Sequence, residues 1–219
     1  MALSKADFNN INVTPAASKK LKWNASANGF ETGDLGGSMV LLSTQTASSS
    51  STISFTSGID STYDKYVFKF YDIHPETDSV SFQFNLSVDT GSNYNVAKTT
   101  TNFRAYNIEN DSDRGLGYRT GSDLAQGTGF LPLSNIEVGN DNDQCAVATL
   151  ELFNPSSTTF VKHFLAISNT YQKDDFTMQH FIGGYGNTTS AVDAVQFKFS
   201  SGNIDAGVIK MYGVGDKQS

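Results

Sequence analysis

The chain has 219 residues, of which 38% are hydrophobic and 17% are charged, and its 22 acidic and 15 basic residues give a formal net charge of −7. Both fractions lie below the averages of globular proteins, and Gly, Ser, Thr and Asn fill the difference, which is typical of strands joined by many loops. Lys and Arg do not cluster into a basic stripe, so we expect no nucleic-acid partner. The length fits one large all-β domain with a small extra element.

The N-terminal residues lack the apolar core of a signal peptide, and no apolar run approaches the ~20 residues of a membrane helix. We therefore expect a protein made in a cytoplasm, without membrane insertion. Cys145 is the only cysteine, so no disulfide forms within the chain. Alternation predicts Cys145 at the start of a strand, packed as a small apolar residue and not acting as a nucleophile.

Residues 1–38 show no sustained period, and we interpret them as an N-terminal extended arm that needs a partner surface. A short helix is predicted near LSKADFNNI, with Ser4 as N-cap, and Pro15 prevents its continuation. The segment KLKWNASANGFE predicts a small hairpin, because apolar residues alternate with lysines, NASANG supplies a turn and an aromatic residue follows it.

A two-residue period prevails in residues 39–219, which we predict to form a β-sandwich domain. In VSFQFNLSV, Val80, Phe82, Phe84, Leu86 and Val88 form one face, predicted to be core, and the polar residues form a wet face. Comparable alternation occurs in TISFTS, KYVFKFYDI, AVATLELF, FVKHFLAIS, VQFKFSS and GVIKMYGVG. In FVKHFLAIS the apolar row is Val161, Leu165 and Ile167. Roughly eight to ten strands follow, without a helical run after Pro15. This predicts an all-β fold, an antiparallel jelly-roll-like sandwich.

The longest loop-rich stretch runs from Asp89 to Gln144, and TTNFRAYNI is its best strand candidate. Loops of this length in a compact domain often carry an interaction. Tyrosines and arginines are typical of binding surfaces, and we predict that they form receptor- or partner-binding loops here. An equal alternative is that the rings pack beneath their own loops. The candidate residues are Tyr94, Arg104, Tyr106, Arg114, Tyr118 and Arg119.

No motif indicates catalysis, a metal or a cofactor. His74, His163 and His180 lack the spacing of a metal motif, and the acidic segments NDSDRG and GNDNDQ are typical of β-turns more than of calcium loops. A glycan-cleaving sandwich enzyme would need two carboxylates that meet in space about 5–9.5 Å apart, which the sequence does not indicate. We therefore predict a non-enzymatic protein with no metal site and no cofactor.

The ending VQFKFSSGN followed by AGVIKMYGVG is similar to the closing hairpin of a family of small structural proteins of tailed bacteriophages, especially marine ones. TISFTSGIDSTYDKYVFKFYDI resembles the opening strands of that family, and LKWNASANGFETGDLGG is similar to segments that join a phage fibre's shaft or base to the next module. In this reading Gly207 and Gly213 bracket a strand, and Gly202 lies in a turn that favours positive φ.

The resemblance implies a virion protein, a β-sandwich of the tail-fibre or head-decoration type, typically a homotrimer and assembled in the host cytoplasm. It implies attachment to other virion proteins through the N-terminal arm, so we expect the apolar side chains of the arm to anchor it. These anchoring candidates are Leu3, Phe8, Leu21, Trp23 and Phe30.

The alternative function is a carbohydrate-binding module, which would favour several large exposed rings in one row on a sheet face. The lone tryptophan, Trp23, lies in the arm, which counts against this alternative. A combined hypothesis is a particle subunit that binds host-surface glycan through its tyrosine-bearing loops.

Overall fold

The computed structural model describes residues 20–24, 26, 29–33, 39–134 and 138–215. The chain divides into two units, Met1–Ser38 and Met39–Ser219. The helix predicted near LSKADFNNI and the predicted anchoring residues Leu3 and Phe8 lie outside the described residues.

The first unit contains an antiparallel hairpin of β1 (Lys20–Trp23) and β2 (Phe30–Gly33). Trp23 pairs with Phe30 at the end next to the turn. The Asn24 backbone N–H donates to the Gly29 carbonyl at 3.0 Å and closes the connection. The hairpin predicted from KLKWNASANGFE is therefore confirmed.

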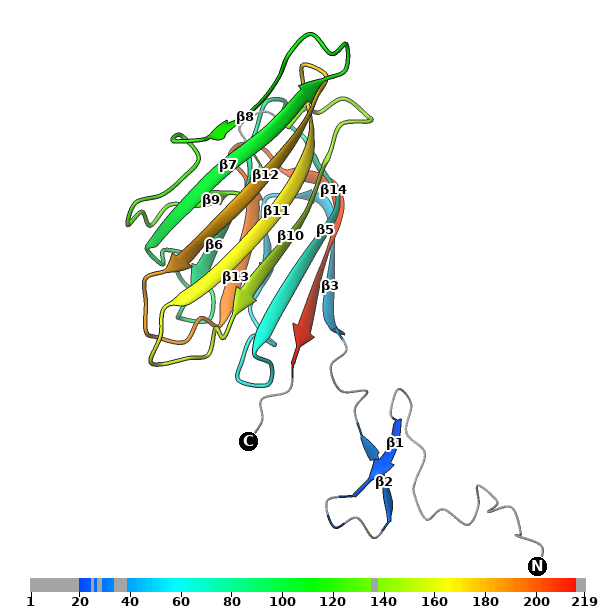
Figure 1. The fold of residues 1–219 in the computed structure, drawn as a ribbon, viewed down its shortest axis with the longest axis vertical. Coiled ribbons are helices and arrows are strands. Elements are labelled where there is room, and N and C mark those ends of the chain that lie inside the picture. The colour runs from blue at the N-terminus through cyan, green and yellow to red at the C-terminus, as the bar shows by residue number, and fades with distance from the viewer. Residues whose placement is uncertain (1–19, 25, 27–28, 34–38, 135–137, 216–219) are drawn as a thin grey trace, which may run out of the picture. The chain divides into compact units, whose positions relative to one another are not determined.

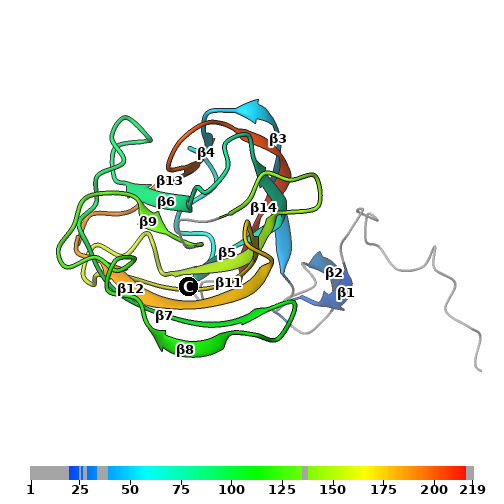
Figure 2. The ribbon, with the colours of Figure 1, turned by 90° about the horizontal axis from the view of Figure 1, so that it is seen from above.

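Two antiparallel sheets form the second unit, which is an all-β sandwich as predicted. Figure 1 shows the long strands of the larger sheet running side by side, and Figure 2 shows that sheet curving beneath the smaller one. The order of the larger sheet is β3 (Val40–Ser50), β14 (Ile204–Val214), β5 (Lys65–Pro75), β10 (Ala146–Phe153), β11 (Lys162–Gln172), β12 (Phe176–Gly186), β7 (Lys98–Ile108) and β8 (Arg114–Tyr118). The order of the smaller sheet is β4 (Ile53–Phe55), β13 (Ala194–Phe199), β6 (Phe82–Ser87) and β9 (Leu131–Pro132). The jelly-roll detail stays a prediction.

The described part of the second unit holds twelve strands, β3 to β14, where alternation predicted roughly eight to ten. The difference comes from short strands, because β4 has three residues and β9 has two, too few for a visible period. TTNFRAYNI is confirmed as part of β7, an eleven-residue strand. Together with β8 and β9, β7 gives the stretch from Asp89 to Gln144 more regular structure than its composition indicated.

Aromatic side chains from both sheets form the centre of the core. The ring centroid of Phe197 in β13 lies 4.9 Å from that of Phe70 and 5.4 Å from that of Phe68, both in β5. It lies 6.0 Å from that of Phe82 in β6. Each such pair contributes about 0.5–1.5 kcal/mol beyond the burial of its area. The inward rows predicted from KYVFKFYDI and VQFKFSS are confirmed.

The wet face predicted for VSFQFNLSV is wrong. Ser81, Asn85 and Ser87 are buried, although Phe82, Phe84 and Leu86 face the core on the other side as predicted. Loop segments on either side of β7 cover this face, since the Asn85 side-chain amide donates to the carbonyl oxygens of Tyr94 at 2.5 Å and Thr128 at 3.0 Å. Val88 lies beyond the end of β6 and is exposed.

The apolar row of FVKHFLAIS points outward, so the face expected for it is reversed. Leu165 and Ile167 are 55% and 49% exposed, whereas Phe164 and Ala166 are buried. The register with β10 sets this parity, because Phe164 lies opposite the buried Leu152. The outer face of the larger sheet is therefore more apolar than the sequence indicated.

The last strand, β14, continues through both glycines that the sequence placed at its ends. Gly202 has φ +67° and lies in the turn before β14, as predicted. Gly207 and Gly213 lie inside the strand, because β14 pairs with β3 and β5 along its whole length. Gly207 has φ +126° and occurs at an irregularity in the register with β5.

Candidate functional site

Four of the six residues predicted on binding loops lie on strands. Arg104 and Tyr106 belong to β7, and Arg114 and Tyr118 to β8. The sequence misplaced them because the Gly- and Asn-rich segments that flank these strands obscure the period. Of these four, Arg114 and Tyr118 are exposed.

The other two predicted residues are partly buried in connecting segments. The Tyr94 hydroxyl is buried, and the Arg119 Nε is buried, each without a hydrogen-bond partner among the described residues. The Arg119 backbone N–H donates to the Asn102 carbonyl at 2.8 Å. The alternative left open by the sequence, that the rings pack beneath their own loops, agrees with the buried hydroxyl of Tyr94.

Arg104 and Tyr106 share a small polar hollow of about 140 Å³. The Arg104 guanidinium carbon lies 4.9 Å from the centre of the Tyr106 ring, and Nη1 lies 3.1 Å from the Met178 sulfur. The Tyr106 hydroxyl donates to the Asp113 carboxylate at 3.3 Å. This volume is well below the roughly 300–1,000 Å³ of usual small-molecule sites. The hollow is lined by Arg104, Tyr106, Asp113, Gln172, Asp174, Phe176 and Met178.

His180 in β12 lies on the inner face of the sheet and is fully buried. Its Nδ1 lies 3.1 Å from the Asn102 Oδ1, so we assign the proton of the neutral ring to Nδ1. Burial, and then the charges of Arg104 and Arg119, lower the pKa of His180 to about 4. His180 is therefore neutral at pH 7 and holds β12 to β7 from inside the sandwich.

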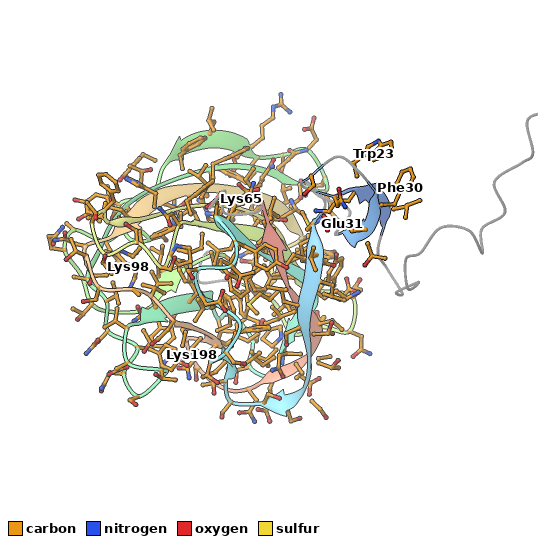
Figure 3. All side chains as sticks on the ribbon, turned by 90° about the horizontal axis from the view of Figure 1, so that it is seen from below. Trp23, Phe30, Glu31, Lys65, Lys98 and Lys198 are labelled. Atoms are coloured by element: carbon orange, nitrogen blue, oxygen red, sulfur yellow. The ribbon has the colours of Figure 1, made fainter. Side chains whose placement is uncertain are left out.

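The hairpin of the first unit carries an aromatic pair that faces solvent. The ring centroids of Trp23 and Phe30 are 4.4 Å apart with the rings stacked, and Figure 3 shows the two side chains next to each other. Trp23 is 61% exposed, and Phe30 and Leu21 are also exposed. Lys22 and Glu31 form an ion pair at 3.2 Å between the two strands. Three of the five predicted anchoring residues are thus brought together on one small hairpin.

The outer face of β11, β12 and β7 forms a second exposed surface. Direct pairing aligns Ile167, Phe181 and Phe103 in one row, and the rings of Phe103 and Phe181 are stacked with centroids 5.0 Å apart. In a neighbouring row, Leu165 pairs with Gly183. We call this surface the outer stripe; it consists of His163, Leu165, Ile167, Asn169, Tyr171, Thr177, Gln179, Phe181, Gly183, Tyr185, Thr99, Thr101, Phe103, Ala105 and Asn107.

The sequence analysis did not predict the outer stripe, because it assigned the apolar residues of every alternating strand to the inner face of the sheet. A signal was present in FTMQHFIGGY, which carries apolar residues on both parities and therefore predicts a strand with two covered faces. No residue of the outer stripe is buried in the chain as it stands. The surface that would cover the second face is therefore not supplied by the described residues of the chain.

Within the described residues, no group of three or more His, Cys, Asp or Glu side chains is placed to hold a metal ion. The acidic residue Asp111 of NDSDRG forms an exposed ion pair with Arg114 at 2.6 Å. Cys145 lies directly before β10, and burial raises the pKa of its thiol, which disfavours a nucleophilic thiolate. A search of the described segments for a helix long and apolar enough to cross a bilayer finds none.

Comparisons with known protein families, with curated proteins and with solved structures find no match to this chain. The class that the fold and the exposed surfaces define is an antiparallel β-sandwich with two uncovered apolar surfaces, the aromatic hairpin and the outer stripe.

Proposed function

We propose that this protein is a non-enzymatic structural subunit of a tailed-phage particle, a β-sandwich displayed on a tail fibre, another appendage or the head and attached through its N-terminal arm. The resemblance of its opening and closing strands to such proteins suggests the class. The observation that carries the proposal is the stacked and exposed pair of Trp23 and Phe30 on the hairpin of the first unit.

A two-stranded hairpin by itself is marginally stable in water, because it has no second layer over its apolar face. The pair of Trp23 and Phe30 sits on such a hairpin, and Trp23 is 61% exposed. Aromatic side chains bury about 150–250 Å² each, and tryptophan and tyrosine are enriched among the residues that dominate binding energy. A partner surface that accepts these rings would stabilise both the hairpin and the attachment.

The partners in this proposal are other virion proteins, and the subunit assembles with them in the host cytoplasm and functions in the virion. The resemblance further implies a homotrimer, which we adopt as the proposed oligomer. Static light scattering of the purified chain measures its mass directly, and a trimer mass would support this part of the proposal.

The test of attachment compares tagged variants supplied in trans during infection, with the tag measured in purified particles. We expect Trp23→Ala to reduce incorporation by at least about tenfold, since the loss of an aromatic anchor commonly exceeds 1.4 kcal/mol. Trp23→Phe is the matched control and should retain most incorporation. Equal incorporation of Trp23→Ala and the wild type would contradict attachment through the hairpin.

The alternative, a carbohydrate-binding module, is opposed by the orientation of the exposed rings. Sugars stack on ring faces that are turned toward solvent, whereas the rings of Phe103 and Phe181 differ by 12° and face each other. Of the tyrosines predicted to contact host glycan, Tyr118 is exposed by 51%, and its hydroxyl donates to Asp123 at 2.7 Å. We keep host-surface glycan as a secondary proposal, with Tyr118 as its contact.

A further inference from the structure

We propose that the outer stripe is the surface through which this chain binds a second copy of itself. The proposal names a self-contact within the structural subunit proposed above, but it requires only a second copy of the chain, so it holds or fails independently of the particle. It rests on the composition and the size of the stripe.

The stripe contains no Lys, Arg, Asp or Glu, although the whole chain has 37 of these residues. Its rows run from Thr, Tyr and His at one end through apolar residues in the middle to Asn, Gln and Tyr at the other. A depletion of charge around an apolar centre with a polar rim is the composition of a protein–protein interface.

Two acidic residues border one end of the stripe, because Glu109 and Asp175 both interact with the Tyr171 hydroxyl. Along the two long margins of the stripe, the charges are paired. Glu151 of β10 lies opposite Leu165 and forms an ion pair with Lys65 at 3.3 Å. At the opposite margin, Arg114 of β8 pairs with Asp111. A partner that approaches the middle of the stripe therefore meets apolar and neutral polar groups.

The net charge of −7 bears on which partner binds the stripe. A basic partner would be drawn to acidic surface, whereas a second copy also carries −7 and is repelled wherever acidic side chains face each other. Contact through an uncharged surface minimises this repulsion. Sheet faces also pack on one another about 10 Å apart with interdigitated side chains, so the face of one sandwich suits the sheet of another.

The size of the stripe suits a stable contact. Each of its three strands has eleven residues, and at ~3.3 Å per residue and ~4.8 Å between strands the stripe measures ~36 Å by ~14 Å, about 500 Å². The neighbouring outward residues of β10 and β8, among them Val147, Leu116 and Tyr118, are exposed and extend it. The total approaches the roughly 800 Å² that each partner contributes to a standard interface.

The test is Ile167→Glu in the full chain, followed by light scattering and sedimentation over a range of concentrations. Ile167 is 49% exposed in the middle row of the stripe, so the variant should fold, and a carboxylate there would be buried without a partner in the contact. We expect the wild type to associate and Ile167→Glu to associate at least about tenfold more weakly. Leu41→Glu is the matched control, because Leu41 is 51% exposed on β3 at the far edge of the same sheet.

A wild type that stays monomeric at every concentration, or an equal effect of Leu41→Glu and Ile167→Glu, overturns the inference. Circular dichroism and thermal unfolding confirm that both variants are folded. Trp23→Ala separates the two proposals: self-association that persists in Trp23→Ala but not in Ile167→Glu supports the stripe whether or not the arm attaches to a particle. Self-association lost in Trp23→Ala and kept in Ile167→Glu assigns the contact to the hairpin and overturns the inference.

Discussion

Two lysines and a histidine lie inside the sandwich. Lys98 and Lys162 are fully buried and lie on either side of Gly186, which pairs with both. The Lys98 Nζ donates to the Val96 carbonyl at 2.8 Å and to the Asn85 side-chain oxygen (Figure 3 labels Lys98), and the Lys162 Nζ donates to the Phe160 carbonyl at 2.6 Å. Burial lowers the pKa of Lys98 to about 8. Backbone carbonyls, which satisfy donors without neutralising charge, hold these groups in place.

The buried imidazole of His180 makes stability depend on pH. Its pKa is lowered from 6.5 to about 4, so the unfolded chain binds a proton between these values that the folded chain does not bind. The contribution is fully present above pH 6.5 and is lost as the pH falls, by about 3 kcal/mol between pH 7 and pH 4. Urea unfolding at both pH values measures this loss.

His180→Gln is the control for this pH dependence, since the glutamine amide can donate to Asn102 and does not titrate. We expect a smaller loss of stability on acidification in His180→Gln than in the wild type. An identical loss in both proteins would assign the acid sensitivity to other groups.

At the scale of elements, the sequence of each segment predicts that it forms a strand, whereas pairing with neighbouring strands decides which of its faces points inward. Alternation in KYVFKFYDI and VQFKFSS predicted which residues point inward. In these strands the apolar residues fall at every second position, or both faces of the strand are covered. In β11 the apolar residues Leu165 and Ile167 compete with Phe164 and Ala166, and only the register with β10 decides which pair enters the core. FTMQHFIGGY alone indicated a second covered face, and the rest of the outer stripe depends on registers that no single strand encodes.

The glycine at the irregularity of β14 supplies a test of an element. A Cβ on Gly207 would lie 2.8 Å from the Asp72 carbonyl oxygen and 3.0 Å from the Ile73 Cα, and its φ of +126° is a conformation that other residues rarely adopt. We expect Gly207→Ala to lower the free energy of unfolding by about 1–3 kcal/mol. The midpoint of urea unfolding at constant m-value measures the change.

Gly117→Ala is the matched control in another strand. Nothing lies within 4 Å of a Cβ at Gly117 in β8, so the effect should be within about 0.5 kcal/mol. Equal destabilisation by the two substitutions would mean that the backbone at Gly207 relaxes without cost.

At the scale of the whole molecule, the two exposed apolar surfaces have different architectures. The hairpin of the first unit presents Trp23 and Phe30 on two short strands, whereas the outer stripe lies on three long strands backed by the core. A marginal hairpin gains structure when it binds, so its affinity includes the cost of ordering. The stripe is held rigid by the sandwich and is available without that cost. The two surfaces therefore suit different partners.

The place of β14 determines when the molecule can become complete during synthesis. β14 lies between β3 and β5, so the last strand of the sandwich separates two of its earliest strands. Until Ile204–Val214 has left the ribosome, the facing edges of β3 and β5 have no partner, and the core beneath them lacks Ile209 and Met211. Unpaired edges of this kind are templates for association with other chains. The sandwich therefore cannot be complete before β14 has been made, and a nascent chain that stalls before β14 is expected to aggregate.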